Sequence, residues 1–332
     1  MRIELVQVNA LGRADWARWR GIGLEARAPV GPFLSPAWAR AAAAARPGAG
    51  VAVIRRAGRI AGFVPVHRAG RGGAALLGAP LALRCGAVAE PGLVCDPAQL
   101  LHAIGADRLH FAAVATRDPV FMGSAYGTAS AWIADCGDGA DAYAQALSEG
   151  RPETVAALDA YAGRLETAYG PLRLSVLPAA ETAAAQAQAM AWRAAARRGP
   201  DPWRRPWAQA LLTRCAALDG SDCAGFWLAL CAGPRRVALA HVLGGDGAAS
   251  LWFCAADPDL AACAPDDLLR RASVAWAAQA GFDSLDLGPG TGAAALATGA
   301  RPLVWGAVEA HAGGRLSPPP RDDRSSGAPA SL

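Results

Sequence analysis

The feature that most constrains the fold is a set of four apolar segments separated by short turns and by one helix. Glycine and proline mark the turns after the first and second segments, at residues 233–235 and 244–247. Between the third and fourth segments, apolar side chains recur at helical spacing over residues 265–280. This order predicts a three-stranded antiparallel meander, a helix, and a strand that returns beside the third strand. The predicted strands are residues 224–231, 237–243, 250–256 and 282–287.

The N-terminal half shows a similar order. Two apolar runs between residues 51 and 68 flank Arg56-Ala57-Gly58-Arg59, which predicts a hairpin. A helix opened by Ser35-Pro36 precedes this hairpin, and a short helix and a strand (residues 97–115) follow it. The similarity predicts two copies of one α/β (α+β) domain, each a mixed, mostly antiparallel sheet flanked by helices.

We expect an N-terminal domain over residues 1–150, a C-terminal domain over 151–312, and a disordered Ser-, Pro- and Arg-rich tail over 313–332. A loop is predicted at residues 70–73, where glycines cluster. The remaining predicted elements are helices after Asp15 and at 36–45, 151–169, 180–198 and 203–215, and strands at 2–8, 131–134, 172–177 and 304–309.

The amino-acid composition excludes several classes of function. All 32 basic residues are arginine, so a catalytic lysine, a Schiff base and a phosphate-loop lysine are excluded. A net charge of +4 over 332 residues, without a basic run, predicts no nucleic-acid partner. The eight cysteines include no CxxC pair, so we expect no metal site and reduced thiols. The N-terminus has no signal-peptide pattern and no long apolar stretch occurs, so we expect a cytoplasmic monomer or homodimer without stable membrane insertion.

Several loose motifs occur in a consistent order over about residues 1–310. They are Pro32-Phe33-Leu34-Ser35-Pro36-Ala37-Trp38, Gly62-Phe63-Val64-Pro65-Val66, the strand series 224–256, Asp257-Pro258, Ala264-Pro265-Asp266-Asp267-Leu268-Leu269 and Asp286-Leu287-Gly288-Pro289-Gly290. In this order they resemble the CelD-type members of the GNAT acyltransferase superfamily, which occur in bacterial exopolysaccharide and cellulose clusters. The layout is more distantly similar to the Fem-type peptidoglycan aminoacyltransferases, which also pair two such domains.

The resemblance implies that acetyl-CoA, or another acyl-CoA, binds as co-substrate to the C-terminal domain. In this fold the third and fourth strands splay apart, and the next helix begins at the gap. Amides and the dipole at a helix start can hold a pyrophosphate, although here Asp266 and Asp267 would fit an ordinary capped helix equally well. The expected contact residues are Phe253, Cys254, Ala255, Cys263, Ala264, Pro265, Asp266, Asp267 and Leu268.

The chain retains only the first half of one sequence pattern of this family. The Asp-x-x-x-Gly-x-x-x-Tyr-Lys pattern of the family begins with Asp286 and Gly290, but Ala294 and Ala295 stand at its Tyr-Lys positions. This departure leaves open a diverged specificity or a weakened enzyme.

Acyl transfer to an amine needs a base or a water relay, and a polarised thioester carbonyl. His241, Asp257 and Asp286 are the candidate bases. Cys254 is either a candidate nucleophile or a buried, inert thiol. Aromatic and cationic side chains suit a sugar or acyl acceptor, but the tryptophans can also be core residues. The candidate acceptor-binding residues are Trp203, Arg204, Trp207, Trp252, Gly288 and Gly290.

We therefore expect an N-acyltransferase that moves an acyl group from acyl-CoA to an amino group on a sugar or small metabolite, in exopolysaccharide biosynthesis on family grounds. One alternative is a degenerate GNAT-fold scaffold or binding protein. Another is an S-adenosylmethionine-dependent methyltransferase, because residues 286–292 imitate its glycine-rich motif. The place of this segment near the end of the chain argues against that reading.

Overall fold

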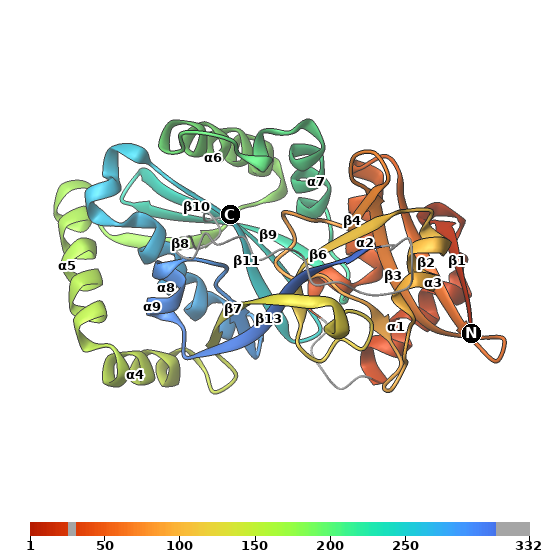
Figure 1. The fold of residues 1–332 in the computed structure, drawn as a ribbon. Helices are drawn as coiled ribbons and strands as arrows, with labels where there is room; N and C mark the ends of the chain where they lie inside the picture. The colour runs from red at the N-terminus through yellow and green to blue at the C-terminus, as the bar shows by residue number, and fades with distance from the viewer. Residues whose placement is uncertain (26–30, 310–332) are drawn as a thin grey trace, which may run out of the picture. The chain divides into compact units, whose positions relative to one another are not determined.

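The computed structural model describes residues 1–25 and 31–309 (Figure 1). The chain divides into two compact units, which we call unit 1 and unit 2. Unit 1 comprises Met1–Ser130 and the chain from Pro302 onward, and unit 2 comprises Ala131–Arg301. The predicted domain boundaries after residues 150 and 312 remain predictions, and the predicted disordered tail, residues 313–332, lies outside the described residues.

In unit 1 the strands follow the order β1-β2-β3-β4-β6-β13, and β5 pairs with β3. Neighbouring strands are antiparallel except β4 and β6, which are parallel. The helices of this unit are α1 (Arg13–Glu25), α2 (Pro36–Ala45) and α3 (Pro97–Ile104). The strands are β1 (Arg2–Gln7), β2 (Ala49–Arg56), β3 (Arg59–Arg68), β4 (Gly73–Leu76), β5 (Val88–Ala89), β6 (Arg108–Ala115) and β13 (Gly299–Glu309).

In unit 2 the strands follow the order β8-β9-β10-β11-β12-β7. Again one pair, β11 and β12, is parallel and the other pairs are antiparallel. The strands are β7 (Ala125–Asp135), β8 (Leu172–Val176), β9 (Ala224–Ala232), β10 (Arg235–Gly245), β11 (Ala248–Ala256) and β12 (Ser284–Asp286). The helices are α4 (Ala140–Gly150), α5 (Pro152–Tyr169), α6 (Thr182–Ala196), α7 (Pro206–Ala216), α8 (Pro265–Gln279) and α9 (Thr291–Leu296).

The two units therefore repeat one plan, as the sequence predicts. Each has a first strand, a three-stranded meander, a helix, a parallel returning strand and a closing antiparallel strand. The repeat extends to a detail of the hairpins, because the third residue of the second strand is bulged in both, at Ala61 and at Val237. Both units are thus mixed, mostly antiparallel α/β sheets flanked by helices.

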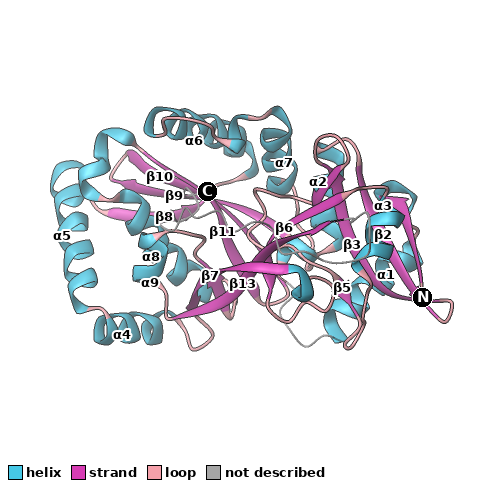
Figure 2. Cartoon of the chain, viewed as in Figure 1, coloured by secondary structure: helices cyan, strands magenta, loops and turns pink. Residues whose placement is uncertain are grey.

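Helices cover both faces of the unit 2 sheet. Figure 2 shows α6 and α7 above the strands β8–β10, and α8 on their other side. On the α8 side, Leu228, Leu230, Ala238, Ala240 and Leu251 from the meander are buried with Leu269 and Val274 of the helix. Such interdigitated burial is the main force that fixes helix and sheet together.

Local sequence explains where several helices begin. The hydroxyl of Ser35 accepts a hydrogen bond from the Trp38 amide at 3.1 Å, and Pro36 occupies the first turn of α2. Helix α3 is capped in the same way by Asp96, and it ends at Gly105 with φ of 61°.

Three expectations need correction. The predicted helix 203–215 is a 3-10 turn (Pro202–Arg204) followed by α7, because a residue before proline is driven out of the α region and Arg205 is extended. The predicted loop at 70–73 leads directly into β4, which begins at Gly73. Helix α4 was not predicted, and it starts at a glycine cap with φ of 97° at Gly139.

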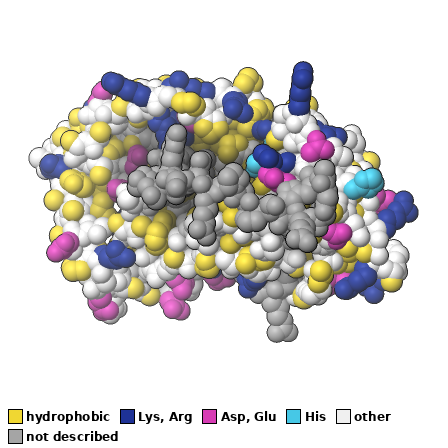
Figure 3. All heavy atoms as spheres, viewed as in Figure 1, with side chains coloured by type: hydrophobic (Ala, Val, Ile, Leu, Met, Phe, Trp, Pro, Cys, Tyr) yellow, Lys and Arg dark blue, Asp and Glu magenta, His cyan; other side chains and the backbone are white. Residues whose placement is uncertain are grey.

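Surface charge and membrane propensity agree with the composition. Figure 3 shows basic side chains scattered singly over the visible face, among other kinds, rather than gathered into one patch. In the described part of the chain, no helix combines the length and apolarity needed to cross a membrane. All eight cysteines are free thiols.

Candidate functional site

The third and fourth strands of unit 2 part after three residue pairs. Strands β11 and β12 pair only from Ala248 with Ser284 to Ser250 with Asp286. Strand β11 continues for six more residues, to Ala256. Along residues 251–256, no strand of the described chain pairs with β11 on that side. The expected divergence of these strands is therefore present.

A β-bulge lies just beyond the point of divergence. Strand β10 pairs Val242 with Leu251 but His241 with Phe253, so Trp252 is the extra residue on β11. Bulges bend a strand and redirect its backbone groups, and they occur often beside active sites. The backbone of β11 is thus bent where it leaves β12.

The chain after β12 turns away from β11. The Gly288 amide donates to Asp286 Oδ1 at 3.0 Å, and the Leu287 amide donates to the Trp132 carbonyl on β7 at 2.8 Å. Gly288 and Gly290 both have positive φ, 77° and 110°, which other residues rarely adopt. The glycine-rich segment therefore forms the turn that separates the two strands and leads into α9.

Unit 1 differs at the equivalent place. Strand β4 also pairs with β6 over only three residues, but the next segment returns and Cys85 forms a parallel bridge with Val114. The Cys85 amide donates to the Ala113 carbonyl at 2.9 Å. The space beside β6 is therefore filled by the protein's own backbone, whereas no strand among the described residues pairs with that edge of β11.

Helix α8 begins with few available amides. Pro265 has no N–H, and the amides of Asp267 and Leu268 both donate to the Ala264 carbonyl, at 3.0 and 3.2 Å. Asp266 and Asp267 add two carboxylates to this turn, and a Cβ on Gly292 would overlap the Asp267 carboxylate. The helix dipole favours an anion here, but the carboxylates oppose one.

A partly buried arginine, Arg270, balances these acids. Its Nη1 lies 2.8 Å from Asp267 Oδ1, and its side chain is 18% exposed. Burial alone would lower the pKa of Arg270, but the acidic groups of Cys254, Asp266 and Asp267 raise it. Burial also raises the pKa of Asp266, an effect that Arg270 counters. The start of α8 therefore carries a permanent cation next to β11.

Cys254 is not prepared for nucleophilic attack. Burial raises the pKa of its thiol to about 12, so it stays protonated at neutral pH. It lies close to Arg270 and Asp266 and can serve as a wall residue of the space beside β11.

His241 lies among aromatic rings on the other face of the sheet. It is fully buried, with its ring centroid 5.3 Å from that of Trp227 and 5.6 Å from that of Trp252. Neither ring nitrogen has a hydrogen-bond partner among the residues that the structure describes. Burial lowers the pKa of His241 to about 3, so the imidazole is uncharged at neutral pH.

Asp257 has structural partners. It lies at the end of β11 and accepts hydrogen bonds from Arg235 Nη2 at 2.7 Å and from the Asp259 amide at 3.1 Å. It thereby caps the 3-10 helix Pro258–Cys263 that leads to α8. Asp286 is also buried, lies at the point of strand divergence, and accepts the Gly288 amide.

The candidate acceptor residues lie in different surroundings. Trp203 is buried, with its ring centroid 5.0 Å from Trp252 and 4.8 Å from Phe253, so it belongs to the core of this face. Arg204 is exposed and donates to the carbonyls of Ala194 and Arg197. Trp207 is partly exposed at the start of α7.

The structure thus brings one group of predicted residues together and separates another. Asp286, Gly288 and the bulged stretch of β11 surround the divergence, and the helix start lies next to Cys254. Arg270 is not among the residues that the sequence pattern singles out. The signal that could have found it is the spacing of three residues from Asp267, which places both groups on one helix face.

A metal site is not evident at this location. Across residues 1–25 and 31–309, no group of three or more His, Cys, Asp or Glu side chains is arranged to hold a metal ion. The chemistry available to the described residues is backbone amide donation, carboxylate or water-mediated proton transfer, and one guanidinium.

The family model described as an acetyltransferase (GNAT) domain matches residues 156–294. This range contains the whole meander, α8, the diverging strands and the glycine-rich segment. No curated protein matches the chain in sequence.

Solved structures share the fold at low sequence identity. A tandem GNAT protein from the clavulanic acid biosynthesis pathway is 13% identical with a TM-score of 0.52, over 93% of this chain and 99% of that one. The C-terminal domain (DUF2156) of a proposed lysylphosphatidylglycerol synthetase from Agrobacterium fabrum has the same identity and TM-score, over 89% and 91%. A conserved protein of unknown function from Bacteroides thetaiotaomicron is 11% identical with a TM-score of 0.52, over 89% and 97%.

The sequence match and the strand plan agree on one assignment. The tandem GNAT likeness covers nearly the full chain, which fits the repeated topology of the two units. Residues 156–294 therefore match the GNAT acetyltransferase domain in sequence, and the chain shares the fold of a tandem GNAT protein.

Proposed function

We propose that the protein transfers an acyl group from acyl-CoA, acetyl-CoA being the simplest donor, to a primary amine. One observation carries this proposal: β11 and β12 part at Ser250 and Asp286, beside the bulge at Trp252, inside the segment that matches the GNAT family. A pantetheine arm is a strand-like chain, and it can pair with the edge of β11 over residues 251–256, which no strand of the described chain occupies.

The chemistry follows from the edge amides. A β11 amide near the bulge donates to the thioester oxygen and stabilises the negative charge that develops there. The amine nitrogen attacks the carbonyl carbon, the C–S bond breaks, and the ammonium proton leaves to a base while the coenzyme A thiolate takes up a proton. The products are an amide and free coenzyme A.

Asp286 is the base that the geometry favours among the three candidates. It lies where β11 and β12 part, with its Oδ1 accepting the Gly288 amide, whereas Asp257 lies at the far end of β11 and binds Arg235. His241 has a pKa of about 3, and its proton affinity is too low for an efficient base near neutral pH. We assign His241 and Asp257 roles in holding β11 in place.

For the donor, we propose contacts from Phe253 to Ala255 and from Cys263 to Leu268, with Arg270 added as the cation for a phosphate oxygen. Arg270 offsets the carboxylates of Asp266 and Asp267, which would otherwise repel a diphosphate.

For the acceptor, we propose an amino group on a sugar or a small metabolite, in exopolysaccharide synthesis of the CelD type. Support comes from the sequence motifs and from the aromatic and glycine residues near the divergence. The proposed acceptor-binding residues are Arg204, Trp207, Trp252, Gly288 and Gly290, and Trp203, a core residue, supports Trp252 from behind.

A second candidate is a binding or scaffold protein with the same fold. Two observations favour it: Ala294 and Ala295 replace the family's Tyr-Lys pair, and the two carboxylates stand at the helix start. Such a protein would retain acyl-CoA affinity without turnover. The methyltransferase alternative fits poorly, because the glycine-rich segment follows a three-residue strand in a mostly antiparallel sheet.

The test combines binding with turnover. Thermal unfolding is measured with a panel of acyl-CoAs and with S-adenosylmethionine, and release of the coenzyme A thiol is measured with amino sugars and polyamines as acceptors. We expect acyl-CoA alone to raise the melting temperature. Binding without thiol release for any acceptor supports the scaffold, and no response to any acyl-CoA contradicts both proposals.

The variant Asp286→Asn tests the role of Asp286 as a base separately from any role in acyl-CoA binding. We expect thiol release to fall about 100-fold while the acyl-CoA dissociation constant stays within about twofold, because an amide cannot accept the proton. The matched control is Asp283→Asn, an exposed carboxylate three residues earlier. Equal rates for the two variants would remove Asp286 from the mechanism.

A further inference from the structure

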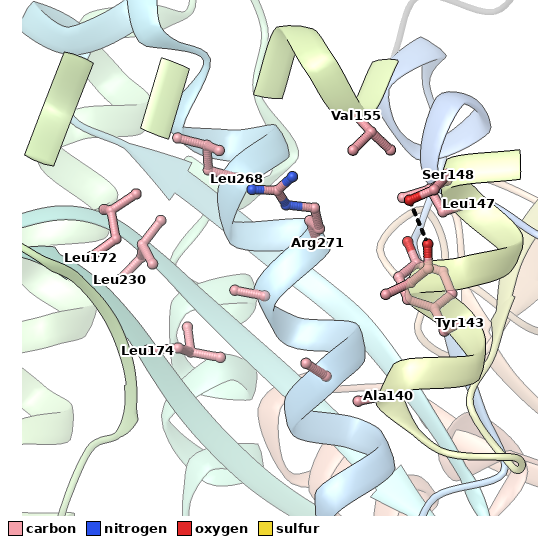
Figure 4. A pocket seen from close by; sticks show the side chains of 13 residues that line it. Ala140, Tyr143, Leu147, Ser148, Val155, Leu172, Leu174, Leu230, Leu268 and Arg271 are labelled. Carbon is pink, nitrogen blue, oxygen red and sulfur yellow. Dashed lines mark hydrogen bonds between the residues drawn. The ribbon is translucent and has the colours of Figure 1, made fainter. Parts of the chain in front are cut away.

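A cavity of unit 2 lies away from the diverging strands. Its volume is about 350 Å³, and it is enclosed by α4, the start of α5, α8 and the strands β8 and β9 (Figure 4). Figure 4 shows Tyr143 and Leu147 of α4 on one side of α8, and Leu172, Leu174 and Leu230 on the other. Helices α4 and α5 both contact α8 and both supply residues to the lining.

The lining is almost wholly aliphatic. No aromatic ring other than Tyr143 lines the cavity, so flat aromatic ligands find no stacking partner there. The aliphatic lining residues are Ala140, Ala144, Leu147, Val155, Leu172, Leu174, Leu230, Leu268, Ala272 and Ala275.

The neutral polar groups of the lining already have partners. The Tyr143 hydroxyl donates to the Leu296 carbonyl at 2.9 Å, and the Ser148 hydroxyl donates to the Ala144 carbonyl at 2.8 Å. They have little capacity left to orient a ligand.

Arg271 is the one charged group in the lining. Its Nη1 contacts Asp159 Oδ1 at 2.7 Å, and the Asp159 side chain is 63% exposed. An ion pair this exposed is weak and exchanges readily, so the guanidinium can accept an anionic group at the cavity mouth.

This cavity shares only Leu268 with the residues proposed to contact acyl-CoA. At 100° per residue, Leu268, Arg271, Ala272 and Ala275 lie on one side of α8. Asp266 and Arg270, next to the diverging strands, lie on the opposite side, and Asp267 lies between the two sides. A ligand in the cavity therefore does not occupy the path proposed for pantetheine.

We infer that the cavity binds an aliphatic carboxylate, with its chain among the leucines and its head group on Arg271. With about 30 Å³ for each water-sized group, the volume admits on the order of ten such groups, which corresponds to a medium-length chain. Pockets of this size with apolar walls and few polar groups are typical ligand sites. The inference does not depend on the proposed acyl transfer.

The probes are decanoate and decanol, titrated calorimetrically into the full chain. We expect both to bind saturably, and Arg271→Gln to weaken decanoate about tenfold while leaving decanol unchanged. The control is Arg214→Gln, an exposed arginine on α7. Acetyl-CoA is not expected to displace decanoate.

Two filling variants test the location. Ala275→Leu on α8 and Ala144→Leu on α4 each add three carbon atoms to the cavity, and we expect either, if folded, to abolish decanoate binding. The inference is overturned if wild-type protein binds neither probe, if both filling variants bind decanoate normally, if Arg271→Gln weakens both probes equally, or if acetyl-CoA competes.

Discussion

Single buried groups set how this chain responds to pH, and His241 is the clearest case. Its pKa in the folded protein is about 3, whereas an exposed histidine titrates near 6.5. The unfolded chain therefore takes up a proton below pH 6.5 that the folded chain refuses. The stability that this group contributes is present above pH 6.5 and is lost as pH falls toward 3.

His241→Phe should make unfolding less acid-sensitive. Between pH 7 and pH 4.5 we expect the variant to lose about 2–3 kcal/mol less unfolding free energy than wild type. Urea unfolding at both pH values measures this difference. His102→Gln, at an exposed histidine, is the control and should retain the wild-type dependence. An identical dependence in His241→Phe would show that the imidazole is not buried as described.

A buried ion pair gives a second test at this scale. Arg193 binds Asp201 with two hydrogen bonds of 2.7 and 3.1 Å, and the side chains are 11% and 1% exposed. Burial alone would raise the pKa of Asp201, but Arg193 lowers it overall, so this stability persists above pH 4 and is lost below. Arg193→Met should cost about 3 kcal/mol in urea unfolding at pH 7.

The exposed pair Arg2–Glu4 is the control for Arg193. Its side chains are 77% and 32% exposed, and Arg2→Met should cost less than about 1 kcal/mol. Similar losses for the two variants would contradict the burial of the Arg193–Asp201 pair.

At the scale of the element, helix α2 shows how strongly a short signal can act. Ser35→Ala removes the hydroxyl that accepts the Trp38 amide, and it should lower the free energy of unfolding by about 1 kcal/mol. Thermal or urea unfolding checks this value. Ser35→Asp restores an acceptor and should recover most of the loss, whereas an unstable Ser35→Asp would indicate a packing role.

Elements with local signals could be predicted from the sequence, and elements fixed by tertiary contacts could not. The start of α2 could be predicted from Ser35-Pro36. The meander β9–β11 could be predicted from the glycine and proline turns between its strands. Strand β4 was missed, because Gly70–Gly73 suggests a loop and its pairing with β3 and β6 is non-local. The divergence of β11 and β12 could be expected only through a family resemblance, since no local pattern encodes it.

The site residues divide in the same way. Asp286 and Gly288 follow a strand and could be placed at its end from the sequence. The burial of Arg270 and the aromatic surroundings of His241 depend on neighbours far along the chain, and sequence spacing alone could not reveal them. Trp203 could be a core or a surface residue, and only the packing distinguishes these.

At the scale of the whole molecule, the last described strand completes the sheet formed by the first third of the chain. Strand β13 pairs with β6 from Leu303 to Glu309, and Leu303, Val304 and Val308 are buried. Ending the chain after Arg301 should therefore expose β6 and destabilise unit 1. Hydrogen exchange should show faster exchange in residues 108–115 than in the wild type.

Unit 2 supplies the internal control for this truncation. Strands β9 and β10 pair only with neighbours in unit 2, so their amides should keep their protection. Uniform loss of protection in both units would mean that the truncated chain is globally unfolded, and unchanged exchange in residues 108–115 would contradict the role of β13.

The central claim is that the edge of β11 beyond Ser250 receives the pantetheine arm of acyl-CoA. Hydrogen exchange measured with and without saturating acetyl-CoA tests it most directly, because a ligand strand protects the amides with which it pairs. If the claim holds, acetyl-CoA slows exchange within residues 251–256 and at the start of α8. Exchange in the segment that fills the gap beside β6 does not change. Unchanged exchange in residues 251–256, or protection only beside β6, would contradict it.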